Sequence, residues 1–155
     1  DPAKAAKLHV NKHVVKMILE TAQMLCSAFS DAPYKKTHSN HPCSIWVRES
    51  RENFMWLVEL GLELHKEYQF RYGANKKHKS LDVIRWCQER VGQVEFNTSG
   101  LTPFAQAMPE EYRCVDPVRA YRTYYLNDKK DLLDWGKRGQ PDWANKMLTE
   151  SCQVV

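Results

Sequence analysis

Several features that would reveal the class of this protein at once are missing from its sequence. No uninterrupted apolar run approaches the ~18 residues that a membrane-spanning helix needs, so no membrane partner is expected. The five cysteines are an odd number without a Cys-x-x-Cys pair, which argues against a disulfide framework or a zinc knuckle. No signal peptide is visible, although the chain starts abruptly at Asp1 and residues upstream are suspected to be missing. These absences predict a protein of a reducing cytoplasm.

A strong charge imbalance and a clear strand pattern are missing as well. The net charge of +4 over 155 residues is compatible with nucleic acid or nucleotide partners without requiring them. Only residues 93–96 alternate weakly between polar and apolar, whereas the rest of the periodicity is helical. We therefore expect an all-α fold, a compact single-domain bundle of four to five helices spanning residues 1–155.

Proline and glycine place the expected helix boundaries. Cap-and-proline signals mark four helix starts, and Gly73 marks one helix end. The expected helices span residues 2–29, 42–72 with a restart at Ser50, 80–91, 117–136, and a short segment after Pro141. Residues 92–116 are predicted to form one long irregular loop, and a loop of that length in a compact domain is often functional.

The first expected helix is apolar around most of its circumference except for one polar stripe. At about 100° per residue, His9, His13, Lys16, Glu20 and Gln23 fall within an arc of roughly 80°. A helix that is apolar on most sides is buried on most sides, so the stripe faces either solvent or an internal cleft. Two imidazoles, an amine, a carboxylate and an amide can transfer protons, bind a metal or hold a phosphate. A plain solvent-exposed face is the competing explanation.

Polar residues also interrupt the core-facing stripe of the second expected helix. Asn53 and Arg71 fall in the middle of that face, and Glu67 lies at its edge. An unpaired buried arginine costs on the order of several kcal/mol, so Arg71 needs an anionic partner. Either an internal carboxylate (Glu20 or Glu67) or a ligand phosphate could fill that role, and the internal ion pair is favoured. We expect Glu20 and Arg71 to meet or to flank one cavity.

A polar loop precedes the second expected helix. Free N–H groups and the helix dipole make such a position suitable for an anion, although simple capping by Asn40 would also explain part of the pattern. We expect this loop to pack beside the histidine end of the first helix and to form one pocket with it. The side chains expected around that pocket are Thr37, His38, His41, Trp46 and Arg48.

Three further patterns are weaker. His9 and His13 at i, i+4 have metal-ligand spacing, but without a second carboxylate or an H-E-x-x-H pattern no metal site is predicted. Cys43 follows a helix start, which would favour a reactive thiolate. Tyr121 lies on an aromatic helix face bordered by basic residues, which suits core packing or base stacking, and Gln106 could close over a cleft.

Six ordered segments carry a family resemblance that spans nearly the whole chain. They are His9–Met17, Glu20–Leu25, Thr37–Pro42, Glu67–Gly73, Gln106–Pro109 and Ala120–Tyr125. Together they resemble a group of small, largely uncharacterised proteins of tailed bacteriophages and environmental viruses. More remotely, the layout resembles the pyrimidine-dimer DNA glycosylase/AP-lyase family, whose members are small, all-α, basic and phage-borne. That resemblance implies Glu20 as the catalytic carboxylate and requires Lys16 to replace the N-terminal amine that those enzymes use.

The leading interpretation is a phage-type, DNA glycosylase-like enzyme that acts on a base or sugar of nucleic acid in the host cytoplasm, without a cofactor. Glu20, Lys16 and His13 are the predicted catalytic residues. The predicted ligand contacts are His9, Lys12, Gln23, Thr37, His38, His41, Trp46, Arg48, Asn53, Glu67, Arg71, Gln106 and Tyr121. Two alternatives remain open: a small nucleotide hydrolase or transferase that uses the same polar cleft, and a non-catalytic phage protein that binds or sequesters a nucleotide or a host factor.

Overall fold

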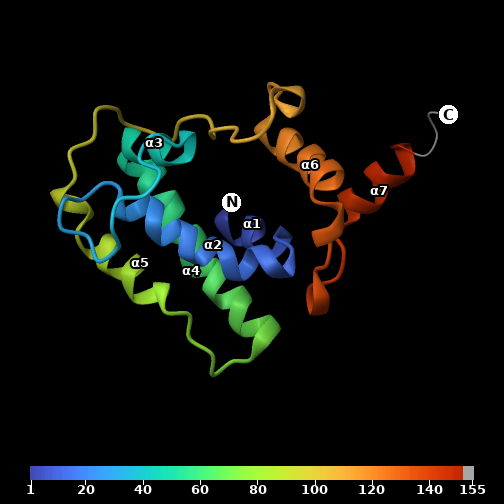
Figure 1. Ribbon diagram of the computed structural model, residues 1–155, viewed down its shortest axis with the longest axis horizontal. Coiled ribbons are helices and arrows are strands. Elements are labelled where there is room, and N and C mark those ends of the chain that lie inside the picture. The colour runs from blue at the N-terminus through green and yellow to red at the C-terminus, as the bar shows by residue number, and fades with distance from the viewer. Residues whose placement is uncertain (152–155) are drawn as a thin grey trace.

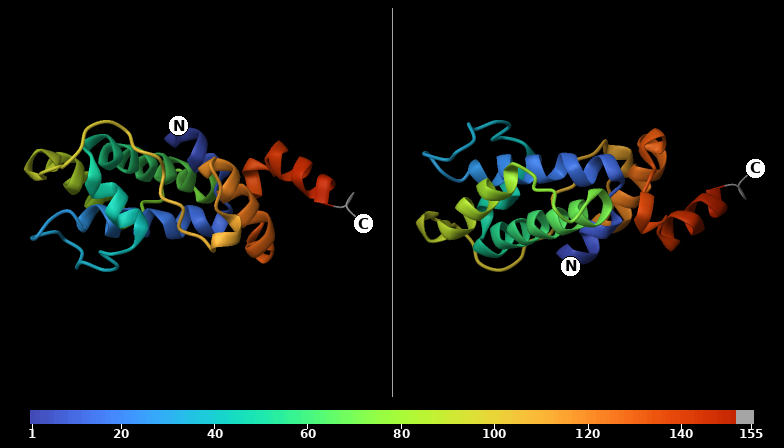
Figure 2. Two further views of the ribbon diagram at one scale, coloured as in Figure 1. Left: turned by 90° about the horizontal axis from the view of Figure 1, so that it is seen from above. Right: turned by 90° about the horizontal axis from the view of Figure 1, so that it is seen from below.

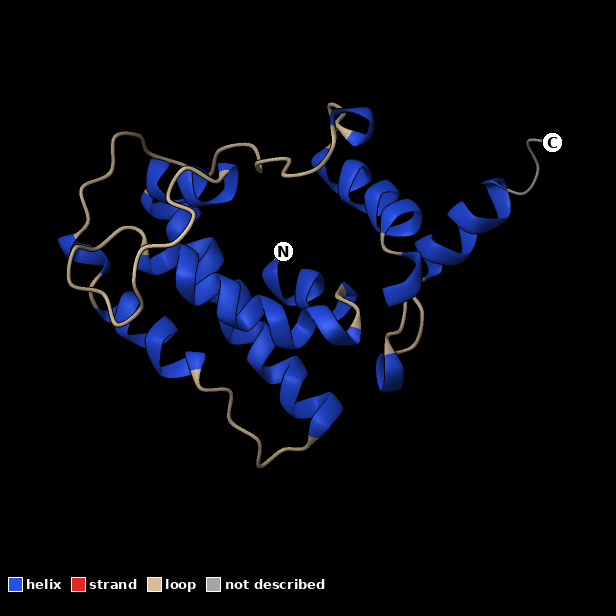
Figure 3. Ribbon diagram, viewed as in Figure 1, coloured by secondary structure: helices blue, strands red, loops and turns tan. Residues whose placement is uncertain are grey.

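The structure, a computed structural model, describes the backbone of residues 1–151 and the side chains of residues 1–146, so Cys152 lies outside it. Its α-helices are α1 (Pro2–Leu8), α2 (Asn11–Cys26), α3 (Pro42–Glu49), α4 (Arg51–Tyr72), α5 (Ser80–Glu89), α6 (Pro117–Asp128) and α7 (Asp142–Ser151) (Figures 1 and 3). Short 3-10 turns lie at Val91–Gln93, Glu110–Tyr112, Lys130–Leu132 and Gly136–Arg138. Residues 1–151 contain no strand, only an isolated bridge between Ser50 and Thr98. The expected all-α class is confirmed, with more and shorter helices than the sequence indicated.

The first expected helix is in fact two helices. His9 and Val10 have extended backbones (ψ 138° and 156°) and separate α1 from α2. Distant residues satisfy the backbone groups at this break, since Arg71 donates to the His9 carbonyl and the Asn11 N–H donates to the Asp134 carbonyl. The placement of His9 on the polar stripe of α2 is therefore wrong, because that stripe assumed one continuous helix.

The second expected helix restarts at Ser50, as the sequence indicated. Ser50 has an extended backbone, and its hydroxyl accepts a hydrogen bond of 3.1 Å from the Asn53 N–H, which caps α4. Gly73, at φ 131°, ends α4, because a left-handed conformation favours glycine. The 22 residues of α4 form the central support of the fold.

The main hydrophobic core lies where α2, α4 and α5 meet, with α1 and α3 packed against α4. Trp46, Leu57, Leu60 and Leu64 from the predicted core face are buried there. Gly61 of α4 allows a close approach of the three helices, since a Cβ at this position would lie 2.8 Å from both Ile84 Cδ1 and Thr21 Cγ2.

The segment from α6 to α7 forms a C-terminal arm (residues 117–151) with a smaller hydrophobic cluster, which includes Val10 from the junction of α1 and α2. The arm lies to one side of the body formed by α1 to α5, and α7 extends away from it in both views of Figure 2. α6 ends at Asp128 rather than near residue 136. The chain then turns back, which lets the Trp135 indole N–H donate to the Leu8 carbonyl at 2.8 Å.

The predicted long loop crosses between body and arm (Figure 1). Residues 94–109 contain no helix and run from the end of α5 past α3 to the arm. None of the helices in the described part of the chain is both long and apolar enough to cross a bilayer.

Candidate functional site

Lys16 and Glu20 form an exposed pair on the surface of α2. Their Nζ and Oε1 atoms are 3.1 Å apart, and the two side chains are 63% and 37% exposed. An exposed i, i+4 pair of this kind contributes only about 0.3–0.5 kcal/mol to stability. The pair is thus accessible to a ligand, and the fold does not depend on it.

His13 lies one turn before this pair and contacts the arm. Its Nδ1 forms a short hydrogen bond with the Tyr125 hydroxyl of α6, and the two rings meet edge to face at 5.2 Å. Burial, followed by the charges of Lys16 and Lys129, lowers the pKa of His13 below 6.5, although Glu20 acts in the opposite direction. The imidazole is therefore largely neutral at pH 7. We call His13, Lys16, Glu20 and Tyr125 the amine–carboxylate site.

Cys43 and Tyr121 border this site from α3 and α6. Burial raises the pKa of the Cys43 thiol, outweighing its hydrogen bond with Tyr121, and the Glu20 carboxylate raises it further. The expected activation of Cys43 at a helix start is therefore wrong, because burial disfavours the thiolate.

The Tyr121 hydroxyl fastens the long loop to α6. It donates to the Ala105 carbonyl at 2.7 Å and accepts from the Ala107 N–H at 3.2 Å. Burial, followed by the neighbouring Cys43, raises the pKa of Tyr121 to about 12. Tyr121 thus holds the loop in place.

Arg71 and Glu67 form the internal ion pair that the sequence favoured. The Arg71 Nε donates to Glu67 Oε1 at 2.8 Å, and both side chains are almost fully buried. The remaining Arg71 donors reach the His9 and Lys7 carbonyls and the Asn11 side chain at 2.9–3.1 Å. The predicted pairing of Glu20 with Arg71 is wrong, since Glu20 pairs with Lys16 and Arg71 with Glu67.

Glu67 also accepts two hydrogen bonds from Arg138 of the arm, at 2.9 and 2.8 Å. Burial raises the pKa of the Glu67 carboxyl, but Arg138 and Arg71 together outweigh it and hold the pKa below its usual value. This cluster joins α4 to the arm, and each of the three donor nitrogens of Arg71 bonds to a protein atom.

Other predicted ligand contacts hold loops rather than face an open site. The Asn53 amide donates to the Trp46 carbonyl and the Thr102 hydroxyl, and accepts from the Thr102 N–H. Trp46 is only 6% exposed, and its indole N–H donates to the Thr102 carbonyl at 3.4 Å, so its ring is not free to stack on a base. Gln106 exchanges hydrogen bonds of 2.6 and 3.0 Å with the Cys114 backbone.

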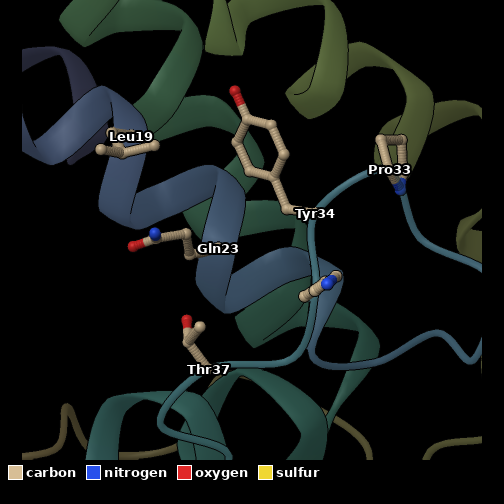
Figure 4. A pocket seen from close by; sticks show the side chains of 6 residues that line it. Leu19, Gln23, Pro33, Tyr34 and Thr37 are labelled. Atoms are coloured by element: carbon tan, nitrogen blue, oxygen red, sulfur yellow. The ribbon is translucent and has the colours of Figure 1, made fainter.

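The loop before α3 packs beside the C-terminal end of α2, whereas the sequence predicted that it would pack beside the N-terminal end, which carries the histidine. Arg48 donates to the Ser27 hydroxyl and the Ser39 carbonyl at 2.9 and 2.7 Å, which ties the loop to the C-terminal end of α2. Thr37 consequently lies near Gln23 rather than near the histidines. These two side chains line a shallow, open pocket of about 450 Å³ together with Leu19, Pro33, Tyr34 and Lys35 (Figure 4).

The remaining predicted contacts are separate from one another. The His9 ring bonds to the Ala5 carbonyl at 2.7 Å, and burial lowers its pKa to about 4. His41 caps α3 by accepting from the Cys43 N–H, and His38 is exposed with a φ of 53°. Lys12 is exposed on α2, the helix that carries the amine–carboxylate site. The single polar pocket expected from the sequence is thus divided into distinct places.

The structure therefore brings together the three predicted catalytic side chains but not most of the predicted ligand contacts. Sequence reasoning missed the roles of Tyr125 and Lys129, which reach His13 from the arm. The i, i+4 spacing of Tyr121 and Tyr125 on α6 was the one available signal. Among the described side chains, no group of three or more His, Cys, Asp or Glu residues is arranged to hold a metal ion. Neither a protein family, nor a curated protein, nor a solved structure matches this chain.

Proposed function

We propose that this protein is a phage-type enzyme that acts on DNA at a base or sugar, in the class of the DNA glycosylases with lyase activity. The observation that supports the proposal is the Lys16–Glu20 pair, an amine and a carboxylate 3.1 Å apart beside the largely neutral imidazole of His13. Chemistry at C1′ of a deoxyribose uses a nucleophile, a negative charge near the sugar and a proton acceptor.

In this proposal, the Lys16 amine loses its proton to His13 or to water and attacks C1′. The bond between C1′ and the base breaks, and the base leaves with the bonding electron pair and takes up a proton. The Glu20 carboxylate stabilises the positive charge that develops on the sugar. The C1′–O4′ bond of the sugar then breaks, and O4′ keeps the bonding pair and takes the proton that leaves the Lys16 nitrogen, which gives an imine between C1′ and Lys16. Loss of a C2′ proton to a base breaks the C3′–O bond, and the phosphate leaves with the bonding pair. One water molecule then hydrolyses the imine and restores the amine.

The surroundings of the pair suit a nucleic-acid substrate. Lys12 adds a positive charge on the same helix, and Lys129 lies close enough to influence His13. Positive charges around such a site would contact phosphates, so binding should weaken steeply as salt concentration rises. The odd number of cysteines without a Cys-x-x-Cys pair supports a reducing compartment, and we propose the host cytoplasm.

Borohydride trapping of the imine tests this proposal. The 155-residue chain is incubated with DNA containing a pyrimidine dimer or an abasic site, and the covalent adduct is measured after reduction. We expect an adduct with the wild type, none with Lys16→Ala, and none with Lys16→Arg, which keeps the charge but does not form the imine. Lys66→Arg is the matched control, because Lys66 also pairs with a glutamate on an exposed helix face. An undiminished adduct with Lys16→Arg, or none with the wild type, would overturn the assignment.

A second candidate is a binding protein without catalysis. It is favoured by the exposure of Lys16, whose side chain is 63% exposed and paired with Glu20, because a lysine amine is usually activated as a nucleophile by desolvation. This function predicts DNA or nucleotide binding that weakens with salt while the ligand is recovered unchanged.

A further inference from the structure

A groove lies between α4 and α5, away from the amine–carboxylate site. In the view of Figure 1, α5 and the loop after α4 lie on the opposite side of α4 from α6. The groove has a volume of about 760 Å³, within the roughly 300–1,000 Å³ range of small-molecule sites. We call it the α4–α5 groove. Residues from α4, from α5 and from the connecting loop line it, among them Leu62, Gln69, Lys76, Leu81, Arg85 and Gln88.

The lining of the groove carries more positive than negative charge. Lys66, Lys76, Lys77 and Arg85 line it, against the two carboxylates Glu59 and Glu63. Lys66 pairs with Glu63, and Lys77 pairs with Asp82 at 2.7 Å. Lys76 and Arg85 form no ion pair with a carboxylate of the described residues. Arg85 is close enough to Asp82 to help lower the pKa of that carboxyl, but the direct partner of Asp82 is Lys77. Lys76 and Arg85 can thus still donate to an anionic group in the groove.

The basic loop is held in place rather than left free. The Gln69 side-chain amide donates to the Ala74 and Lys76 carbonyls at 3.1 and 3.0 Å. The His78 N–H donates to His65 Nε2 at 3.3 Å, which fixes the other end of the loop to α4. The backbone at Lys76 is therefore positioned before any ligand arrives, which lowers the entropy cost of binding.

The rest of the lining suits a planar, partly apolar group. Leu62 of α4 supplies apolar surface, with the largely buried Leu81 of α5 beneath it, and the amides of Gln88 and Asn75 supply hydrogen-bond donors and acceptors. Apolar surface, amides and two available cations together match a heterocyclic base that carries phosphate. The geometry points to the α4–α5 groove as a binding site for a nucleoside phosphate, with the phosphate at Lys76 and Arg85. This site is separate from the proposed DNA chemistry and does not depend on it.

Titration calorimetry on the 155-residue chain tests the inference. The probes are nucleoside mono- and triphosphates, inorganic phosphate and a short single-stranded oligonucleotide. We expect saturable binding of a nucleoside phosphate, and much weaker binding of inorganic phosphate. Arg85→Gln and Lys76→Gln should each weaken nucleotide binding about tenfold or more, as expected for loss of a charged hydrogen bond. Arg51→Gln is the matched control, because Arg51 is exposed, carries the same charge and does not line the groove.

Each contrary outcome is informative. No binding of any nucleotide at millimolar concentration would overturn the inference, as would equal losses for Arg51→Gln and Arg85→Gln. Inorganic phosphate that binds as tightly as the nucleotide would reduce the groove to a simple anion site. If an oligonucleotide binds there while free nucleotides do not, the nucleotide assignment is overturned, and the ligand of the groove is a nucleic-acid backbone. Lys16→Ala should leave nucleotide binding unchanged, so this test and the trapping experiment can fail independently.

Discussion

At the scale of single residues, the buried ion pair of this protein should contribute far more to its stability than the exposed pair. Arg71 and Glu67 are shielded from solvent and hydrogen-bonded to each other, whereas Lys16 and Glu20 are open to solvent. Removing one partner of a buried pair leaves an uncompensated charge, whereas removing one partner of an exposed pair leaves an ion that water solvates. Substitutions at the two glutamates should therefore have different effects.

Glu67→Gln is expected to lower the free energy of unfolding by about 3–5 kcal/mol, because Arg71 would keep its charge in a buried position. Chemical denaturation measures the change. Glu63→Gln is the control, since Glu63 forms a more exposed pair on the same helix, and a change below about 1 kcal/mol is expected there. Equal effects of the two substitutions would contradict the role of Glu67.

Glu20→Gln should leave the free energy of unfolding within about 1 kcal/mol of the wild type, since its pair with Lys16 is exposed. It should nevertheless abolish the borohydride-trapped adduct, because glutamine keeps the size of the side chain but loses the charge that the sugar needs. Denaturation and trapping are measured on the same preparation. An early-melting variant would instead indicate a structural role.

The sequence identified Arg71 as buried and in need of a carboxylate, but it left two candidates. The i, i+4 spacing of Glu67 and Arg71 on one helix is local information, and it agrees with the structure. Arg138, which also pairs with Glu67, lies 71 residues after Glu67 in the chain, and no helical periodicity reveals such a contact. The same holds for Tyr125, which reaches His13 across 112 residues.

At the scale of helices, the contact of α2, α4 and α5 depends on the absence of a side chain at Gly61. Gly61→Ala should lower the free energy of unfolding by about 1–2 kcal/mol, because the cost of overpacking exceeds the gain of about 1 kcal/mol in helix propensity. Thermal or chemical denaturation measures this change in the free energy of unfolding. Gly92→Ala is the control, because a Cβ there would meet nothing within 4 Å. A more stable Gly61→Ala variant would mean that Ile84 moves aside freely.

Helix boundaries were predictable where local chemistry sets them. Ser50 and Gly73 act through their own side chain or backbone conformation, and both were identified from the sequence. The break at His9 and Val10 has neither glycine nor proline, and contacts from Arg71 and Asp134 stabilise it. The early end of α6 likewise accompanies the packing of the arm on α1.

At the scale of the whole molecule, burial lowers the pKa of His9, His13, His65 and His78. The unfolded chain therefore binds more protons than the folded chain between the lowered values and 6.5. Stability should be fully present above pH 6.5 and fall as the pH drops toward 5. His9 alone, with a pKa of about 4, contributes about 2 kcal/mol of this loss at pH 5 and about 3 kcal/mol below pH 4.

Denaturant unfolding at pH 7.5, 6 and 5 measures this dependence. His9→Gln should reduce the slope, because glutamine does not titrate. His38→Gln is the matched control, since His38 is exposed and its removal should leave the slope unchanged. A stability that stays constant from pH 7.5 to 5 would contradict burial of the neutral rings.

The C-terminal arm is fastened to the body independently of the long loop that leads to it. Trp135 and Asp134 are hydrogen-bonded to α1 and α2, and Arg138 is paired with Glu67 of α4. Cutting the chain within residues 94–109 would therefore leave two fragments that stay associated, like the halves of a split reporter protein. The two pieces, expressed separately, should find each other and restore the contact between Tyr125 and His13. A split within this loop would therefore make the proposed activity depend on association of the two fragments.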